Sequence, residues 1–259
     1  MDIEDLSPEI VTRDLTTRFI GQRVIYHPTL TSTMDVARQE ARRGASEGTV
    51  VLADRQTAGR GRMERVWLSP GGNIALSLIL YPPLSYLPYL IMLASLAVVH
   101  SIGTVTGLKP QIKWPNDVLI NGKKVCGILI ESDVQGNSVS YSIIGIGLNI
   151  NLSPADFPEI SPIATSLSHE LGNDVSRLKV LRVLLMELEG LYQQLSDAGS
   201  VFREWRDSLE TLGREIEVKS GDTLYRGVAE SVAADGTLLL RGADGSLVKI
   251  VAGDVTLHR

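Results

Sequence analysis

The chain has 259 residues, enough to bury a sizeable core in one domain or two. Hydrophobic residues make up 44% of the sequence and charged residues 21%, which is the composition of an ordinary soluble globular protein. The formal net charge of −5 argues against a general nucleic-acid-binding protein, because such proteins usually carry a basic excess.

The sequence also bears on the compartment. The single cysteine, Cys126, cannot form an internal disulfide, which favours a reducing environment. The N-terminal segment MDIEDLSPEI is acidic and polar, so it does not resemble a signal peptide. The longest apolar stretch, residues 87–99, is shorter than a membrane span and is interrupted by Pro88 and Ser95. We therefore expect a cytoplasmic protein that does not enter the membrane.

Helices and strands alternate in the predicted structure of the first half of the chain. Helices are predicted over 7–19, 33–43 and 86–105, and strands over 23–27, 49–55 and 73–80. The first helix begins at a Ser-Pro pair and places Val11, Leu15 and Phe19 on one face. Either Ser32 or Thr33 caps the second helix, and the third is apolar enough to be buried.

The next segments predict more strands of the same sheet. Residues 111–114, 117–120 and 124–132 form short strands, the last two joined in a β-hairpin by the turn at 121–122. A strand over 138–151 is predicted to be central, because its apolar run is nearly unbroken. Two helices follow, at 176–195 and 199–210.

The pattern changes after Gly213. Short alternating runs are separated by Gly-Asp and Asp-Gly turns, which predicts a small all-β module of about five strands, most simply a compact barrel. We place the domain boundary at 211–213.

The segment TAGRGRMERVWLSPGGN, residues 57–73, is the strongest candidate for ligand binding. It carries Arg60, Arg62 and Arg65 among glycines, and no apolar period runs through it. Glycines let a backbone approach a ligand closely, and guanidinium groups match carboxylate and phosphate geometry. It is not a P-loop, because no Gly-Lys-Ser/Thr follows. The segment predicts an anion site, against the alternative of a solvated turn, and leaves the anion unidentified.

A second polar cluster is predicted where the strand over 111–114 ends. Lys113 and Asp117 flank a turn, and the hairpin folded at 121–122 returns Lys124 to the neighbourhood of Asp117. One lysine and one carboxylate would then converge, facing the arginines. A plain turn with solubilising lysines stays open as the alternative.

The stretch IGIGLNIN, residues 144–151, places Gly145, Gly147 and Asn149 on one face of a strand. Such glycines mark either a ligand or tight packing against a helix, and neither interpretation is favoured. Asn149 lies inside an apolar run, so its side-chain amide requires a hydrogen-bond partner. The histidines and the cysteine show no metal-ligand spacing, and no nucleophile elbow or dinucleotide-binding fingerprint is present. The sequence thus indicates an anion site without a protein nucleophile.

Five segments in series resemble the biotin protein ligases. They are TSTMD at 31–35, the arginine-rich segment, KWPNDV at 113–118, GKKVCGILIE at 122–131 and IGIGLNIN at 144–151. Each is weak alone, but their order and spacing are specific. The resemblance implies an α+β fold: a mixed-sheet catalytic domain of the biotin/lipoate-transferase type, residues 1–212, and a C-terminal SH3-like β-barrel, residues 213–259.

The resemblance also implies a two-step reaction. Biotin and ATP with Mg²⁺ give biotinyl-5′-AMP and pyrophosphate, and a lysine of a biotin carboxyl carrier protein or domain, of acetyl-CoA carboxylase or a related carboxylase, then attacks the acyl carbon. The adenylate is itself the activated acyl donor, so the enzyme needs positive charge and exclusion of water rather than a nucleophile.

Site residues are implied by position within the matching motifs. Those implied for biotin are Ser32, Thr33, Gln56, Arg60, Gly61, Arg62 and Lys124, and those implied for the nucleotide are Lys113, Asn149 and Arg65. Those implied for catalysis are Lys124, Arg60, Arg62 and Asp117, with Asp117 orienting the carrier lysine, and no residue is implied as a metal ligand. Met34 stands where asparagine is common in the family, and Met63-Glu64 where an Arg-Gly pair is frequent.

Two other functions are weighed against the ligase. A lipoate or octanoyl transferase of the same fold would lack the combination of GRGR and KWPND. A biotin-sensing regulator would need the N-terminal DNA-binding domain that some family members carry, and the residues before position 25 are too few for it. We therefore expect no nucleic-acid partner, and a homodimer is left open.

Overall fold

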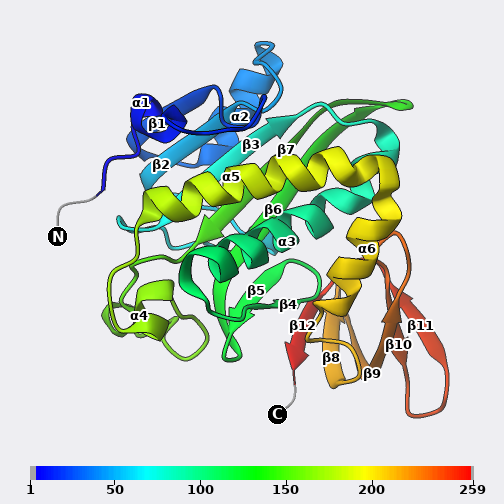
Figure 1. Cartoon of the computed structure of the whole chain (residues 1–259). Coiled ribbons are helices and arrows are strands. Elements are labelled where there is room, and N and C mark those ends of the chain that lie inside the picture. Colours follow the sequence, from blue (N-terminus) through cyan, green and yellow to red (C-terminus); the bar gives the residue numbers. More distant parts are fainter. Residues whose placement is uncertain (1–3, 258–259) are drawn as a thin grey trace.

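Two β-sheets organise the chain, a large one packed between helices and a smaller one near the C-terminus (Figure 1). The computed structural model describes residues 4–257, except for the side chains of Glu64 and Leu257. The expectations that fall on residues 1–3, on residues 258–259 and on the Glu64 side chain therefore lie outside the described residues.

The described helices are α1 (Pro8–Thr12), α2 (Thr33–Arg42), α3 (Leu87–Thr106), α4 (Leu167–Leu171), α5 (Arg177–Gln193) and α6 (Ala198–Asp207). The large sheet contains β1 (Val24–Leu30), β2 (Val50–Gln56), β3 (Ile74–Leu80), β4 (Gln111–Lys113), β5 (Asp117–Ile120), β6 (Lys123–Gln135) and β7 (Ser138–Leu148). The small sheet contains β8 (Glu215–Ser220), β9 (Thr223–Val232), β10 (Leu238–Arg241), β11 (Leu247–Ile250) and β12 (Asp254–Leu257).

The large sheet is mixed, as predicted. Its order is β1-β2-β3-β7-β6-β5-β4; β1 pairs with β2 in parallel, and the other neighbours are antiparallel. β7 lies at the centre, which its apolar run predicts, since a central strand is covered on both faces. The predicted hairpin joins β5 and β6 through Asn121 and Gly122, both with positive φ.

Side chains of successive strand residues enter two separate cores. On β3, Leu76, Leu78 and Leu80 belong to the main core, whereas Ile79 belongs to a smaller cluster on the opposite face. Figure 1 shows α3 and α5 lying across the main-core face of the sheet. Helix α2 covers the other face by packing on β2, β3 and β7. Both faces are therefore buried, which explains why β3 and β7 are apolar along their length.

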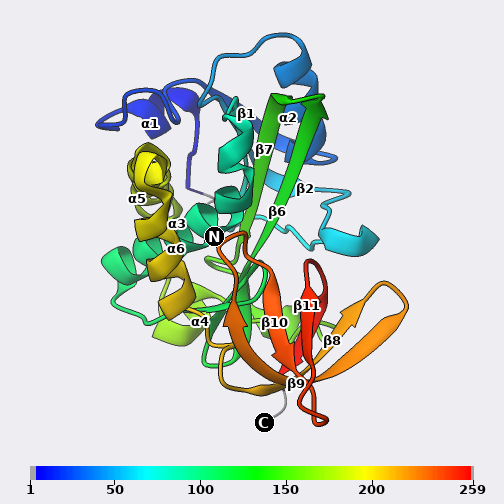
Figure 2. The ribbon, with the colours of Figure 1, turned by 90° about the vertical axis from the view of Figure 1, so that its right-hand side faces the viewer.

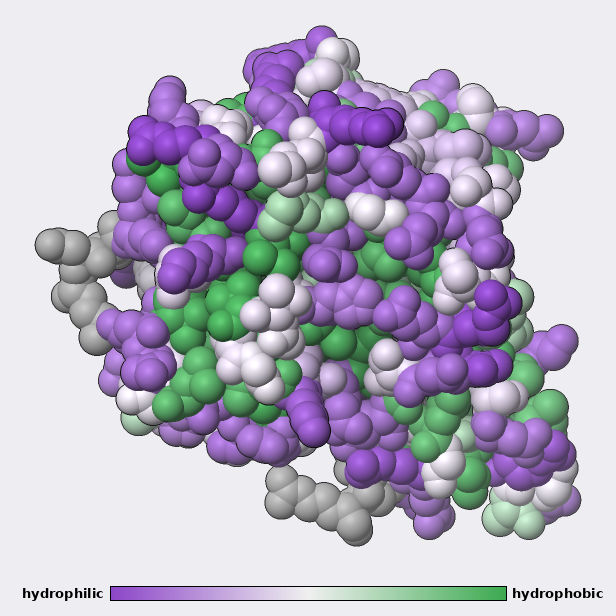
Figure 3. All heavy atoms as spheres, in the orientation of Figure 1, coloured by the Kyte–Doolittle hydropathy of each residue, from purple (hydrophilic) through white to green (hydrophobic). Residues whose placement is uncertain are grey.

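Helix α3 corrects the expectation that the apolar stretch is too short to span a membrane. Among the described residues, Leu84–Thr106 is long and apolar enough by length and composition alone. Pro88 lies in the first turn, and the Ser95 hydroxyl donates to backbone carbonyls one turn back, so neither residue interrupts the helix. However, α3 packs against α5 and the sheet as a core helix, and on this face of the molecule hydrophilic residues are interspersed with smaller hydrophobic patches (Figure 3).

The helix predicted over 7–19 is wrong in length, because α1 ends at Thr12. Asp14 adopts a positive φ of 64°, which breaks the helical backbone. The backbone N–H groups of residues 18–20 donate to the carboxylate of Glu189 on α5 instead of to a preceding turn. The backbone N–H groups of this segment are thus hydrogen-bonded by a residue that is far away in the sequence.

His100 on α3 joins three helices. Its ring nitrogens lie 2.9 Å from a Glu187 carboxylate oxygen on α5 and 2.7 Å from one of Glu204 on α6. Burial lowers the pKa of His100, but the hydrogen bonds with both glutamates outweigh it and raise the pKa above its ordinary value. The protonated imidazole therefore stabilises the helical layer.

The small sheet packs onto the large domain. Its order is β11-β10-β9-β8-β12, and all neighbours are antiparallel. The buried Trp114, which follows β4, donates its indole N–H to the Gly236 carbonyl at 2.9 Å. Apolar residues of the small sheet join the main core: Ile216, Val218, Ala229, Val232, Leu238 and Leu240. Figure 2 shows this sheet below the long β6–β7 hairpin.

Candidate functional site

A cavity of about 570 Å³ is the candidate site. It lies against β6 and β7 of the large sheet, under the arginine-rich segment, and is completed by residues 253–256 of the small sheet. The sequence-predicted residues that line it are Ser32, Thr33, Gln56, Arg60, Gly61, Arg62, Arg65, Lys113, Asp117, Lys124 and Asn149. The fold thus brings together motifs that are more than a hundred residues apart.

One end of the cavity is neutral and polar. The Gln56 side-chain oxygen accepts from the backbone N–H of Thr33 at 2.8 Å, and Ser77 donates to the Thr33 hydroxyl at 2.8 Å. Ser32 occupies the N-cap position of α2 but makes no side-chain capping bond. Its side-chain oxygen is buried and has no hydrogen-bond partner among the described residues. An unsatisfied buried hydroxyl is costly, so this oxygen is available to a ligand.

Glycines of the two central strands form the cavity floor. Gly147 pairs with Gly127 on β6, and the indole of Trp67 lies over both. A Cβ on Gly147 would come within 2.3 Å of the Trp67 ring, and one on Gly145 within 2.6 Å of the Met34 sulfur. These glycines accommodate close packing, including packing by α2 through Met34. The side chains of Trp67 and Met34 also line the cavity, so the glycines shape the cavity as well as the packing.

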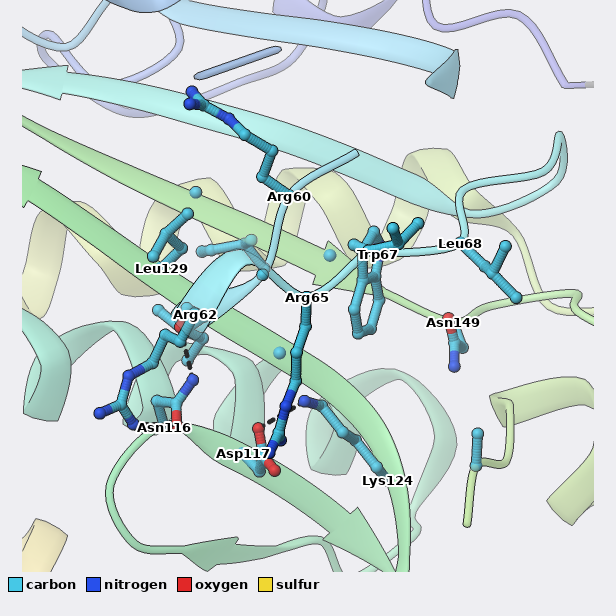
Figure 4. A pocket seen from close by; sticks show the side chains of 18 of the residues that line it. Arg60, Arg62, Arg65, Trp67, Leu68, Asn116, Asp117, Lys124, Leu129 and Asn149 are labelled. Atoms are coloured by element: carbon cyan, nitrogen blue, oxygen red, sulfur yellow. Dashed lines mark hydrogen bonds and ion pairs between the residues drawn. The ribbon is translucent and has the colours of Figure 1, made fainter. Parts of the chain in front are cut away.

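The other end of the cavity is cationic. Lys124 Nζ lies 2.6 Å from one Asp117 carboxylate oxygen, and Lys113 Nζ lies 3.8 Å from the other. Lys124 Nζ also lies 5.5 Å from the centre of the Trp67 ring, within the range of a cation–π contact. The convergence of Lys124 and Asp117 follows from the β5–β6 hairpin, as predicted, and is visible in Figure 4.

The arginine-rich segment folds back on itself. The N–H of Trp67 donates to the carbonyl of Gly59 at 2.9 Å, and that of Gly61 to the carbonyl of Arg65 at 2.7 Å. Between them a short 3-10 turn, Arg62–Glu64, places Met63 at a positive φ of 54°. The segment thus forms a hairpin-like loop closed by backbone hydrogen bonds, which its sequence does not predict.

Arg60 is directed away from the cationic cluster. Its guanidinium pairs with Asp35 of α2 at 2.7 Å and lies 3.8 Å from Glu131 of β6. Figure 4 shows Arg60 extending in the opposite direction from Arg65. The sequence prediction that Arg60 contacts a ligand therefore requires this side chain to leave its carboxylate partners.

Arg62 and Arg65 face the cluster. Arg62 donates to the Asn116 side-chain oxygen at 2.8 Å, and burial lowers the pKa of this guanidinium. Arg65 donates to the carboxylate of Asp254, and this hydrogen bond raises the pKa of Arg65. Both arginines are therefore held by acceptors from other parts of the chain.

Asn149 has the partner that the sequence requires. Its side-chain N–H donates to the carbonyl of Thr165 at 3.0 Å, and its backbone N–H to that of Val125 at 2.9 Å. The segment carrying Thr165 also flanks Lys124, whose backbone N–H donates to the Ile163 carbonyl at 2.8 Å. Asn149 and Lys124 are thus fixed by the same connection.

The cavity-lining residues that sequence reasoning missed include Trp67, Asn116 and Asp254. Trp67 and Asn116 stand inside the quoted motifs, so their position could have been found from the sequence. Asp254 stands in one of several Gly-Asp and Asp-Gly turns of the C-terminal module and carries no local signal.

The cysteine and the clustering of possible metal ligands bear on nucleophilic and metal chemistry. Cys126 is fully buried, and burial raises the pKa of its thiol. No group of three or more histidine, cysteine, aspartate or glutamate residues that could hold a metal occurs in the described part of the chain. The lining of the cavity suits a molecule with a neutral polar end and an anionic end.

Comparison with known proteins places the chain among ligases. A model of the "Biotin/lipoate A/B protein ligase family" matches residues 26–149, and one of the "Biotin protein ligase C terminal domain" matches residues 211–257. The "Bifunctional ligase/repressor BirA" of Bacillus subtilis is 41% identical over 258 residues, covering 97% of this chain and 79% of the relative.

Two further proteins are similar over most of their length. The "Biotin--[acetyl-CoA-carboxylase] ligase" of Paracoccus denitrificans is 36% identical over 79% of this chain and 89% of the relative. The solved structure of the biotin protein ligase from Aquifex aeolicus in complex with biotin and ATP superposes with a TM-score of 0.78 at 28% identity, covering 92% of this chain and 99% of that one.

Proposed function

The chain belongs to the biotin protein ligase family, and from that membership and the cavity we propose its reaction. The protein activates biotin with ATP to biotinyl-5′-AMP and transfers the biotinyl group to a lysine of a carboxylase carrier protein. The observation that carries the proposal is that a neutral hydrogen-bonding end and a cationic end meet in one cavity. Biotin has a matching polarity, with a ureido ring at one end and a carboxylate at the other.

Biotin would lie along the glycine floor. The unpartnered Ser32 hydroxyl, with Thr33 and Gln56, would meet the ureido ring. The acyl chain would cross beside Trp67, and the carboxylate would reach Lys124. This orientation satisfies the buried hydroxyl and places the only charged group of the ligand at the cationic end.

The first step needs positive charge more than a protein nucleophile. A carboxylate oxygen of biotin attacks the α-phosphorus of ATP, the bond to the β-phosphate oxygen breaks, and pyrophosphate leaves. Lys124, Arg62 and Arg65 line the space where this negative charge develops. Preorganised cations at such a position stabilise the transition state. Lys113 and Asn149 would contact the nucleotide.

We propose that Mg²⁺ arrives with ATP. Of the two described carboxylates that line the cavity, Asp254 is the counter-ion of Arg65, and Asp117, which pairs with Lys124, would offer at most one ligand. Such a donor set fits an ion that keeps most of its phosphate and water ligands. Bound there, the ion would neutralise charge on the phosphates.

In the second step the neutral amine of the carrier lysine forms a bond with the acyl carbon, the bond from that carbon to the phosphate oxygen of AMP breaks, and the proton lost by the nitrogen passes to solvent. Asp117 pairs with Lys124 at the cationic end of the cavity, and the paired carboxylate oxygen would be freed if Lys124 turned to the phosphate. Its carboxylate would then orient the incoming amine by accepting a hydrogen bond.

Further features of the protein are proposals that its composition and fold support. The net charge of −5 supports a protein without a nucleic-acid partner. The single buried cysteine supports a cytoplasmic location. The five antiparallel strands of the small sheet support an SH3-like barrel. No membrane partner is proposed, and a homodimer is compatible with these features.

The two alternatives are not favoured. The description of the first family model includes lipoate ligases. The description of the second, which matches the C-terminal residues, names biotin protein ligases alone. Of the relatives similar over most of the chain, one is named a bifunctional ligase/repressor and another a ligase, so both names include the ligase activity that a purely regulatory protein would lack.

Transfer of labelled biotin tests the proposal. The protein is incubated with ATP, labelled biotin and a biotin carboxyl carrier domain, and the carrier is analysed by intact mass and peptide mapping. We expect one biotin on one lysine. A matched carrier in which that lysine is replaced by arginine should stay unlabelled. Labelling with lipoate and not with biotin would establish the transferase alternative instead.

A further inference from the structure

Asp254 connects the small sheet to the candidate site. It begins β12, yet its carboxylate faces the cavity of the large domain and pairs with Arg65. The preceding Gly253 is tightly packed, because a Cβ there would come within 2.6 Å of the Val218 side chain and 3.0 Å of the Lys219 carbonyl oxygen. The approach of Asp254 to the cavity is therefore fixed by backbone packing.

The surroundings of Asp254 are cationic. Burial raises the pKa of Asp254, but the hydrogen bond from Arg65 and the charges of Arg65, Lys113 and Lys124 outweigh it and hold the pKa below its ordinary value. Asp254 is thus an ionised counter-ion to Arg65. Asp117 is likewise ion-paired with a cation of the cluster, Lys124.

In the proposed reaction, a nucleotide phosphate would need the same guanidinium. An arginine fork that binds a carboxylate also matches phosphate, and the two anions cannot occupy it together without repulsion. The Arg65 side chain is 63% exposed, so it can exchange partners at the open edge of the cavity. Asp254 is itself 35% exposed and can turn toward solvent.

We propose that Asp254 is a positioning residue that holds Arg65 at the edge of the cavity and releases it to the phosphates of ATP. The inference rests on the proposed function, because it takes ATP as the second substrate. Asp254 leaves Arg65 before the chemical step, so it acts on nucleotide binding and not on the rate of adenylate formation. The last strand of the small sheet thereby tunes the affinity of the large domain for its nucleotide.

Asp254→Asn tests this exchange, because it removes the charge and keeps the side-chain shape. Pyrophosphate release is measured in a single turnover by biotin-saturated protein at increasing ATP concentration. We expect the half-saturating ATP concentration to fall about fivefold, equivalent to about 1 kcal/mol, with the maximum rate unchanged. Asp254→Glu retains the carboxylate and should stay near wild type. The difference between Asp254→Asn and wild type should shrink as salt screens the ion pair.

Glu230→Gln is the matched control. It removes a carboxylate from another ion pair of the small sheet, with Arg241 at 2.7 Å, and Glu230 does not line the cavity. Its half-saturating ATP concentration should equal that of wild type. An unchanged or higher value in Asp254→Asn would overturn the proposal, and a higher value with a lower melting temperature would assign Asp254 a purely structural anchoring role. If wild type released no pyrophosphate from biotin and ATP, the proposed function itself would fail.

Discussion

Gly147→Ala adds one methyl group to the floor of the cavity and should remove most of the activity. The new Cβ would lie 2.3 Å from Trp67 Cε2 and 2.4 Å from Nε1. Ordinary carbon–carbon contact is roughly 3.5 Å, so the indole must retreat by about 1 Å. Trp67 cannot move alone, because Lys124 Nζ lies over its ring and its backbone N–H is bonded to Gly59.

The expected magnitudes follow from this displacement. Overpacking of this kind lowers the free energy of unfolding by about 1–3 kcal/mol, and the low end applies here because the Trp67 side chain borders the cavity. A shift of about 1 Å in the groups that position a substrate can reduce the rate about 100-fold. Activity should therefore fall far more than stability.

The assay is the single-turnover rate of pyrophosphate release, measured together with the melting temperature. Gly145→Ala on the same strand face provides a graded comparison, because its methyl meets the flexible side chain of Met34 and should cost less. Gly190→Ala on α5 meets nothing within 4 Å and should leave the rate unchanged. A normal rate in Gly147→Ala at unchanged stability would refute the role given to Trp67.

Three further predictions concern charged residues. Lys124→Ala should slow pyrophosphate release about 100-fold through loss of a charge-assisted contact with the reacting phosphate; Lys123→Ala is the control, and a near-normal rate in Lys124→Ala would move the role to Lys113. Arg62→Gly should retain biotinyl-5′-AMP poorly and label added serum albumin, as measured by blotting for biotin, whereas albumin labelling equal to wild type would exclude retention by Arg62. His100 has a raised pKa in the folded protein, so its contribution to the free energy of unfolding is complete below the unfolded pKa of about 6.5 and is lost as pH rises through the folded pKa. His100→Gln should abolish that part of the pH dependence in urea unfolding, and an unchanged pH profile would contradict it.

The fold could be predicted where local patterns decide it. The unbroken apolar run of β7 predicted its central place, and the turn at 121–122 predicted the hairpin that brings Lys124 to Asp117. The first helix was predicted too long because the carboxylate of Glu189, far along the chain, binds the backbone at 18–20. The spacing of apolar residues along the sequence cannot reveal such a distant hydrogen-bond partner.

The sequence predicted which motifs contribute residues to the candidate site. It did not predict the directions of their side chains or their ion-pair partners. Arg60 and Arg65 stand five positions apart, yet they point in opposite directions because their acid partners, Asp35 and Asp254, lie on different elements. Asp254 itself follows an ordinary turn. The orientation of these arginines depends on tertiary packing, which the sequence does not express locally.

Pyrophosphate release in the absence of any carrier protein is the most direct test of the two-step account. The protein is mixed with ATP and saturating biotin, and pyrophosphate is measured against protein concentration, with biotinyl-5′-AMP identified by mass spectrometry after quenching. We expect a biotin-dependent burst of about one pyrophosphate per protein molecule, because adenylate formation precedes transfer and the intermediate stays bound. Pyrophosphate that appeared only after addition of the carrier domain would contradict the account.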